Sequence, residues 1–297
     1  MYPNIYDEIL EAIRYSPRFF DNCQTEKFEE YLSSLQDNLI NLRKSYKKDW
    51  VQADYRDIKT QAAYLLAYYP QYAEICSDIF CQIEQEFNFN ADFKISFLGS
   101  GPCPEIIGFL YFLSQHSENN HNLETNVFDL ETSHWQSARE ITEYLVGRYN
   151  QEHYINIHPH TIDLCEPRSP DKFSRIFKES NIIVFQNCLN ELWQQNIVQD
   201  NLDSILDLAP SQSLFFIIDR RYVSLLQISN FLQNKTNNHQ NFVIVREYQE
   251  FGYENLQKTS FRVNIPEILV SNLFDNNVDG LFLRKWKKYC SIILRKN

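Results

Sequence analysis

The sequence predicts an α/β protein, with a doubly wound, seven-stranded and mostly parallel sheet that follows a helical appendage. Residues 1–90 show helical periodicity, and from Lys94 onward short apolar runs alternate with amphipathic segments of helix length. A Gly-x-Gly turn comes directly after the first of these runs. We therefore expect a helical domain over residues 1–90 and an α/β domain over residues 91–297.

Length and charge narrow the class of protein. The 297 residues are 43% hydrophobic, which is enough apolar side chain for a substantial core. Lys and Arg number 28 against 39 for Asp and Glu, so the formal net charge is −11. This balance disfavours sequence-independent binding to nucleic acid or to anionic lipid.

The seven cysteines are scattered and form no CxxC pair, which indicates neither a disulfide framework nor a zinc knuckle. The pair His158 and His160 has no third ligand at metal spacing, and we interpret it as surface, with no metal site. The chain shows no secretory signal and no apolar run near the ~18 residues of a membrane span. We expect a cytoplasmic protein that does not enter a membrane.

The helical part contains its clearest pattern between Tyr55 and Phe87. Apolar and aromatic residues recur there at helical spacing, and Pro70 divides the run into two helices. Its tyrosines could cover a bound ligand, although aromatic residues at this spacing more often belong to a core. These tyrosines are Tyr64, Tyr68, Tyr69 and Tyr72.

The α/β part divides into strands and helices in alternation. The predicted strands are 95–98, 125–130, 154–164, 182–186, 214–219, 242–246 and 289–294. The predicted helices are 104–115, 133–149, 171–179, 191–208 and 222–233, with a further short helix near 266–273. Helices that connect successive parallel strands by right-handed crossovers produce a doubly wound sheet.

The strongest local signal is the turn Gly99-Ser100-Gly101, which joins the first strand to a helix beginning near Pro104. Two of only six glycines occur here. Glycine lets the backbone turn tightly and approach a ligand without a Cβ, which suits a nucleoside-type cofactor. A purely structural strand-to-helix turn is the alternative.

Acidic residues follow the next two strands. Asp129 ends the second strand, where a carboxylate beside the glycine turn can accept the hydroxyl hydrogens of a ribose; it could instead cap the next helix. Asp163 ends the third predicted strand, where it could accept from a purine amino group or simply be solvated.

The fourth strand ends in amides and an acid. Gln186 and Asn187 follow an apolar run, and Asn190 and Glu191 come a few residues later. Because ligands of open α/β sheets lie beyond the carboxyl ends of strands, this segment is expected to line a reaction site. Asn187, Asn190 and Glu191 are candidates to orient or deprotonate a substrate, or they only begin the next helix.

In this order and at these intervals, the four segments resemble the cofactor-binding motifs of class I S-adenosylmethionine-dependent methyltransferases, which have a Rossmann-like fold. The resemblance covers residues 94–219. It implies S-adenosylmethionine as cofactor, with Gly99, Ser100 and Gly101 at its methionine part, Asp129 at the ribose, Asp163 at the adenine, and Gln186 and Asn187 near the sulfonium. Further implied contacts are Pro102, Glu105, Leu130, Trp135 and Leu164, and the implied catalytic residues are Asn187 and Glu191.

The chain departs from this family at two positions. The family commonly has an acid where this chain has Phe97, and a third glycine where it has Cys103. Glu105 is a candidate to replace the missing acid at the cofactor's amino group. The Gly-Ser-Gly-Pro-x-Pro turn also resembles nicotianamine synthase, which transfers the aminocarboxypropyl arm of the same cofactor.

These observations lead to a transferase that methylates a small-molecule, peptide or protein acceptor. Such chemistry depends mainly on holding the reactants in line and excluding water. Three alternatives remain open, namely aminocarboxypropyl transfer, a catalytically inactive binding or assembly module, and a dinucleotide-dependent oxidoreductase. The last lacks a third small residue at the helix start and a recognisable hydride-transfer constellation. No motif identifies the acceptor or an oligomeric state.

Overall fold

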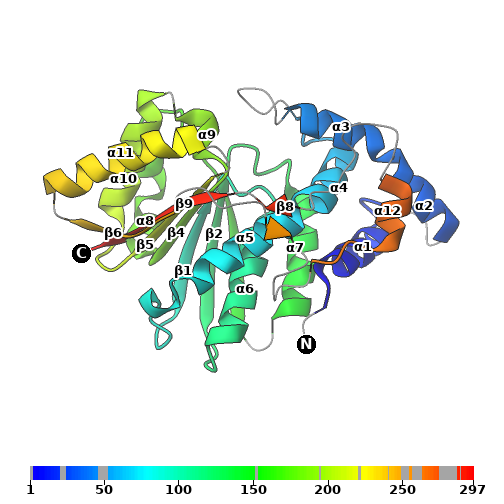
Figure 1. Ribbon diagram of the computed structural model, residues 1–297, viewed down its shortest axis with the longest axis horizontal. Coiled ribbons are helices and arrows are strands. Elements are labelled where there is room, and N and C mark those ends of the chain that lie inside the picture. The colour runs from blue at the N-terminus through cyan, green and yellow to red at the C-terminus, as the bar shows by residue number, and fades with distance from the viewer. Residues whose placement is uncertain are drawn as a thin grey trace.

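The computed structural model of the chain describes residues 3–20, 25–45, 53–150, 153–193, 195–219, 222–239, 241–248, 254–255, 263–273, 286–287 and 289–297. Within these residues, helices cover both faces of one sheet. Further N-terminal helices lie beyond the helices that cover one of the two faces (Figure 1).

The sheet has seven strands in the order β3-β2-β1-β4-β5-β9-β6. Neighbours among β1 to β5 pair in parallel, whereas β9 is antiparallel to both β5 and β6. The strands are β1 (Phe93–Leu98), β2 (Asn122–Asp129), β3 (Tyr154–Thr161), β4 (Ile182–Gln186), β5 (Leu214–Asp219), β6 (Phe242–Tyr248) and β9 (Cys290–Lys296). The predicted doubly wound, mostly parallel sheet is confirmed. Its winding reverses between β1 and β4, where such sheets bind ligands.

Alternation along the strands builds two cores. Phe97 belongs to the core on one face and Leu98 to the core on the other, because successive side chains of a strand point to opposite faces. The first core contains residues of α1 (Ile5–Tyr15), α4 (Ile58–Ala67), α5 (Tyr69–Cys81), α6 (Pro104–His116) and α7 (Gln136–Tyr149). The second contains residues of α8 (Ser174–Glu179), α9 (Leu189–Leu192), α10 (Asn196–Leu208) and α11 (Tyr222–His239).

The helical part confirms the predicted break near Pro70. Asp57 caps α4 by accepting from the backbone N–H of Lys59 and of Thr60, both at 3.2 Å. The chain bends at Tyr68, and Pro70 lies in the first turn of α5, where a missing N–H is tolerated. Since α4 and α5 share one core with the sheet, these two helices are held directly against it. The domain boundary expected at residue 90 stays a prediction.

The helices α2 (Thr25–Ser34) and α3 (Gln36–Ser45) complete the N-terminal group. The predicted C-terminal helix is present as α12 (Glu267–Leu273), which packs against α2. Just before it, Asn4 donates to the carbonyl of Asn264 at 2.7 Å and accepts from its N–H at 3.0 Å. The short strands β7 (Glu254–Asn255) and β8 (Trp286–Lys287) pair with each other.

Several predicted boundaries were wrong; for example, β2 begins at Asn122 rather than at residue 125, and α11 extends to His239 rather than to residue 233. The third strand ends at Thr161, not 164, because β2, its one partner among the described strands, ends at Asp129, opposite Thr161. The helix predicted over 191–208 is two helices, α9 and α10, interrupted where Trp193 packs edge-on against Phe231 at 5.4 Å. The helix predicted from residue 171 begins as a 3₁₀ turn over Ser169–Phe173.

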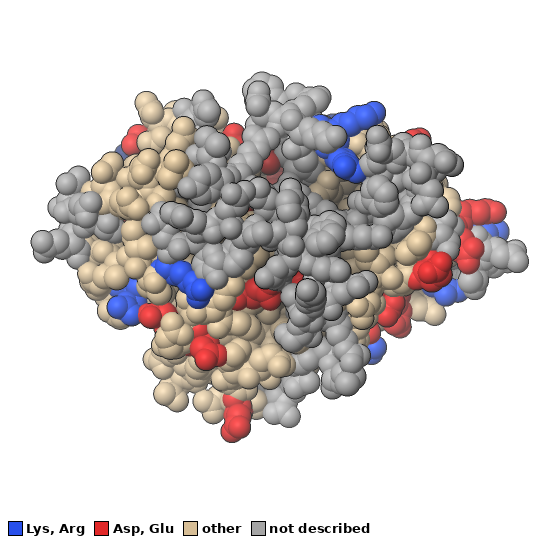
Figure 2. All heavy atoms as spheres, in the orientation of Figure 1, with Lys and Arg blue, Asp and Glu red and all other residues tan. Residues whose placement is uncertain are grey.

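The described helices include none that is long and apolar enough to cross a membrane. On the face in Figure 2, the described Lys and Arg side chains occur in small groups with Asp and Glu nearby, as on an ordinary mixed-charge surface.

Candidate functional site

The glycine turn requires glycine for two reasons. Gly99 and Gly101 have φ values of +65° and +52°, which favour glycine. A Cβ on Gly99 would lie 2.3 Å from Cys188 Cβ, and one on Gly101 would lie 2.9 Å from the Trp135 ring. The turn therefore allows β1, β4 and the start of α7 to approach closely. Cys103, at the position of the family's third glycine, keeps a left-handed φ of 60°.

Asp129 binds the glycine turn directly. Its Oδ2 accepts the N–H of Gly101 at 2.9 Å, and its Oδ1 accepts the N–H of Glu131 at 2.9 Å. Burial raises the pKa of the Asp129 carboxyl, although these two N–H donors act in the opposite direction. Asp129 is therefore held in place, and each oxygen has capacity for another donor.

A cavity of about 240 Å³ opens at this end of the sheet. Its lining includes nearly all the site residues predicted from the sequence: Gly99, Ser100, Gly101, Glu105, Asp129, Leu130, Trp135, Asp163, Leu164, Gln186, Asn187 and Glu191. Asn190, which lies in α9, is not part of the lining, and neither is Pro102. The carbonyl of Pro102 accepts the hydroxyl hydrogen of buried Thr142, so Pro102 contributes to the core.

Glu105 occupies a buried position in the cavity wall. It is 2% exposed, and its Oε2 has no hydrogen-bond partner within the described structure. Burial raises the pKa of this carboxyl to about 8. Phe97, where the family has an acid, is instead fully buried under the helices on one face of the sheet. The carboxylate of this site therefore comes from the first turn of α6 rather than from the end of β1.

The amides that follow β4 face the same cavity. Gln186 is 4% exposed; its Nε2 donates to the carbonyl of Tyr72 at 3.1 Å, whereas its Oε1 has no partner in the described structure. Asn187 has a φ of +56°, and both polar atoms of its side chain lack a partner there. A buried polar group without a partner is unfavourable in a folded protein, so this cluster is typical of a polar ligand site.

Asp163 and Glu191 do not lie at the strand end and the helix start where the sequence analysis placed them. Asp163 is in the turn after β3, and its Oδ1 accepts the N–H of Cys165 at 2.7 Å. Glu191 and Asn190 lie within α9, which begins at Leu189, so neither residue caps that helix. Both Asp163 and Glu191 line the cavity.

An aromatic wall, formed by Tyr55, Tyr64, Tyr72 and Trp135, closes one side of the cavity. The Trp135 ring lies 4.2 Å from the Tyr55 ring and 4.9 Å from the Tyr64 ring, between centroids, and the Tyr64 and Tyr72 rings are 6.2 Å apart. Of the other tyrosines considered from the sequence, Tyr69 bonds to Thr142 at 2.9 Å and Tyr68 packs behind Tyr64.

Some lining residues were missed by sequence reasoning: Tyr55, Glu131, Ile162, Cys165, Cys188 and Leu192. Ile162 and Cys165 flank Asp163, and Cys188 and Leu192 flank predicted residues, so adjacency was an available signal. No such signal in the sequence pointed to Tyr55, because this residue reaches the cavity only through the packing of the N-terminal helices.

A second hollow lies between Trp193, Gln199, Gln227, Asn230 and Phe231 on α10, α11 and the turn before α10. Among the residues that the structure describes, its lining contains no ionisable side chain and no strand end. The cavity at the glycine turn is therefore the candidate site.

No protein-family model and no curated protein sequence matches the chain. Several solved protein structures do match the chain. An O-methyltransferase family protein from Burkholderia thailandensis is 10% identical over 91% of this chain and 70% of its own, with a TM-score of 0.42. TrmN from Thermus thermophilus is 12% identical over 78% of this chain and 53% of its own, with a TM-score of 0.42, so the chain spans about half the length of TrmN.

A putative methyltransferase from Streptococcus mutans, solved with S-adenosylhomocysteine (SAH), is 10% identical over 73% of this chain and 97% of its own, with a TM-score of 0.39. At these identities and TM-scores, the matches carry no residue-by-residue correspondence. The strand order, the antiparallel β9 and the site at the switch point define the class of fold: the chain has a Rossmann-like α/β fold with a doubly wound, mostly parallel sheet.

Proposed function

We propose that the chain binds S-adenosylmethionine in this cavity and transfers its methyl group to an acceptor. One observation carries the proposal: buried polar atoms that have no hydrogen-bond partner among the described residues, on Glu105, Gln186 and Asn187, lie around a glycine turn whose N–H is bonded to Asp129. A polar ligand with several donors and acceptors would satisfy these atoms.

The residues present fit such a ligand. Asp129 has free acceptor capacity on both oxygens for ribose hydroxyls, and Asp163 keeps an oxygen for the adenine amino group. Glu105 provides a buried carboxyl group for the ammonium of the methionine part. Gln186 and Asn187 would lie near the sulfonium. When bound, the cofactor supplies a methyl group activated by its attachment to sulfur.

The other proposed roles are orientation and exclusion of water. Trp135 and Tyr64 are 4% and 7% exposed, so the aromatic wall shields the cavity from solvent on one side. Asn187 and Glu191 would orient the acceptor or accept its proton from the opposite side. Positioning of this kind provides much of the catalysis in group transfer.

Isothermal titration calorimetry of the full chain with S-adenosylmethionine and with SAH tests the proposal. We expect binding of both, and mass analysis after incubation with candidate acceptors should give SAH as the spent cofactor. Methylthioadenosine as the product would identify aminocarboxypropyl transfer, and binding without turnover would favour an inactive module. Absence of binding to either compound would contradict the proposal.

The proposed location is cytoplasmic. The described residues include six free cysteines, namely Cys76, Cys81, Cys103, Cys165, Cys188 and Cys290. Unpaired thiols are typical of a reducing compartment, which supports this location.

A further inference from the structure

The acidic side chains in the cavity lining outnumber the basic ones, although buried Glu105, with a pKa of about 8, adds no negative charge at neutral pH. Five acidic residues line it (Glu105, Asp129, Glu131, Asp163 and Glu191), whereas its described lining contains no Lys, Arg or His. Three basic groups outside the lining act on its acids, and Arg56 is one of them, through its charge interaction with Glu131. Arg139 acts on the Asp129 carboxyl from α7, and His134 bonds to Glu131 at 2.5 Å. A ligand that enters this space therefore gains more from positive than from negative charge.

The proposed cofactor does not balance this excess alone. It brings two positive centres, the sulfonium and the ammonium, and one negative carboxylate, so its net charge is a single positive one. Glu105, Asp129 and Asp163 would serve its ammonium, ribose and adenine. Glu191 and Asn187 also line the cavity, in the region proposed to meet the acceptor.

The aromatic wall favours the same kind of ligand. Trp and Tyr rings attract cations placed over their faces, by about 1 kcal/mol when the cation is solvated and more when it is desolvated. Tyr55 is half-buried, and its ring lies 4.2 Å from the Trp135 ring, so the two aromatic side chains line the cavity together. An anionic acceptor, such as a phosphate or a carboxylate, would meet aromatic faces and acidic side chains with no described cation to pair with.

We propose that the acceptor is a small organic cation, which binds between the aromatic wall and Glu191. The proposal rests on the proposed function, because it places the cation beside a bound cofactor. It narrows the acceptor class to amines and related cations and excludes phosphorylated compounds and nucleic acids. The acceptor atom is not part of the proposal.

Calorimetry of the full chain saturated with SAH tests it, with three probes that share one ring and differ in charge: benzylamine, benzyl alcohol and benzoate. We expect benzylamine to bind about tenfold more tightly than benzyl alcohol, which corresponds to one favourable cation contact. Benzoate should bind more weakly than either. The readout is binding, so it does not depend on turnover.

Two pairs of variants locate the contact. Glu191→Gln should remove most of the preference for benzylamine over benzyl alcohol, whereas Glu179→Gln, an equal change of charge on the distant helix α8, should keep it. Tyr55→Phe should retain the preference and Tyr55→Leu should reduce it by about threefold, because only the phenyl ring keeps the cation contact.

The outcomes separate the two proposals. If SAH does not bind, the proposed function fails and the inference fails with it. If SAH binds but benzylamine shows no preference over benzyl alcohol, or no probe binds at millimolar concentration, only the inference is overturned. A preference that survives Glu191→Gln and Tyr55→Leu together also overturns it, since the cation would then bind elsewhere.

Discussion

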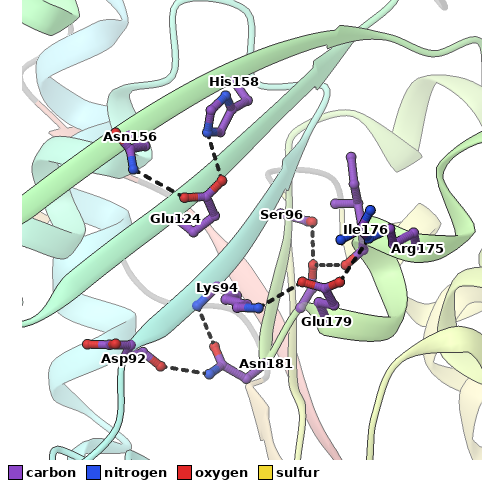
Figure 3. A network of polar contacts seen from close by, with 11 residues as sticks. Asp92, Lys94, Ser96, Glu124, Asn156, His158, Arg175, Ile176, Glu179 and Asn181 are labelled. Carbon is purple, nitrogen blue, oxygen red and sulfur yellow. Dashed lines mark hydrogen bonds and ion pairs between the residues drawn. The ribbon is translucent and has the colours of Figure 1, made fainter.

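The two ends of the sheet differ in whether their ionisable side chains are paired with one another. In its amino-terminal half, Glu179 pairs with Lys94 at 2.8 Å and with Arg175 at 3.2 Å, and Glu124 pairs with His158 at 2.7 Å (Figure 3). At the carboxyl ends, Glu105 is buried with an oxygen that has no described partner. Charges that satisfy one another stabilise a fold, whereas buried groups left unsatisfied indicate a place where a ligand completes the structure.

Ser96 and Asn181 extend this contrast. The Ser96 and Ser180 hydroxyls bond at 2.7 Å, and Asn181 accepts from the N–H of Lys94 at 3.0 Å while donating to the carbonyl of Asp92 at 3.0 Å (Figure 3). Even the neutral polar groups are thus paired at the amino ends. Gln186 and Asn187, after the same strand β4, are not fully paired in the described structure.

The largest effect is expected from breaking the turn at the carboxyl end. Gly99→Ala places a Cβ 2.3 Å from Cys188 Cβ at a φ of +65°, and we expect a loss of about 3 kcal/mol in the free energy of unfolding. Gly147→Ala is the matched control, because no atom lies within 4 Å of the added Cβ and alanine favours the helix. Urea unfolding measures both; equal effects would contradict the close approach described here.

Removing the charge of Asp129 tests whether the carboxyl end is the binding end. Asp129→Asn loses the carboxylate that would accept two ribose hydroxyls, and SAH affinity should fall by about 2 kcal/mol, roughly thirtyfold. Glu124→Gln makes the same change of charge in the amino half of the same strand and should leave SAH affinity unchanged. Similar losses in the two variants would show that overall charge, not this site, governs binding.

The buried acid gives a pH-dependent prediction. The pKa of Glu105 is about 8 in the folded chain against an ordinary 4.5, so the folded state holds a proton that the unfolded state releases between these values. Stability of the ligand-free protein should therefore fall as pH rises through this window, by up to about 1.4 kcal/mol per pH unit from this group.

Glu105→Gln cannot ionise and should lack this contribution. In urea unfolding at about pH 5 and about pH 8, the variant should lose less stability between the two conditions than the wild type does. Parallel pH dependences would contradict the burial of an unpaired carboxyl.

The smallest effect is expected at the amino end. Lys94 and Arg175 hold the pKa of the Glu179 carboxyl below its usual value, so this pairing stabilises the fold at neutral pH and is lost as pH falls through the lowered pKa. Because Glu179 is solvent-exposed, Glu179→Gln should lower the melting temperature only slightly, and less at high salt. A large, salt-independent loss would contradict the view that these charges pair only at the surface.

Much of the fold follows from local pattern. The apolar runs located all seven strands of the sheet, and a helix appears wherever amphipathic periodicity indicated one, because both signals depend on residues close in sequence. Errors fell at boundaries that depend on distant partners. β3 stops at Thr161 because β2 ends opposite it, and nothing within β3 encodes that limit.

The sequence by itself determined the turn at Gly99 and Gly101 and the acids that follow β2 and β3, since strand ends and the need for a left-handed backbone are local properties. Only the tertiary structure decided that Phe97 is buried in a core, that Glu105 lines the cavity with one oxygen unpartnered among the described residues, and that Tyr55 reaches a turn 44 residues away in the chain. Those outcomes depend on how α4 and α5 pack against the sheet. Such packing is a sum of many weak long-range contacts that no short stretch of sequence specifies.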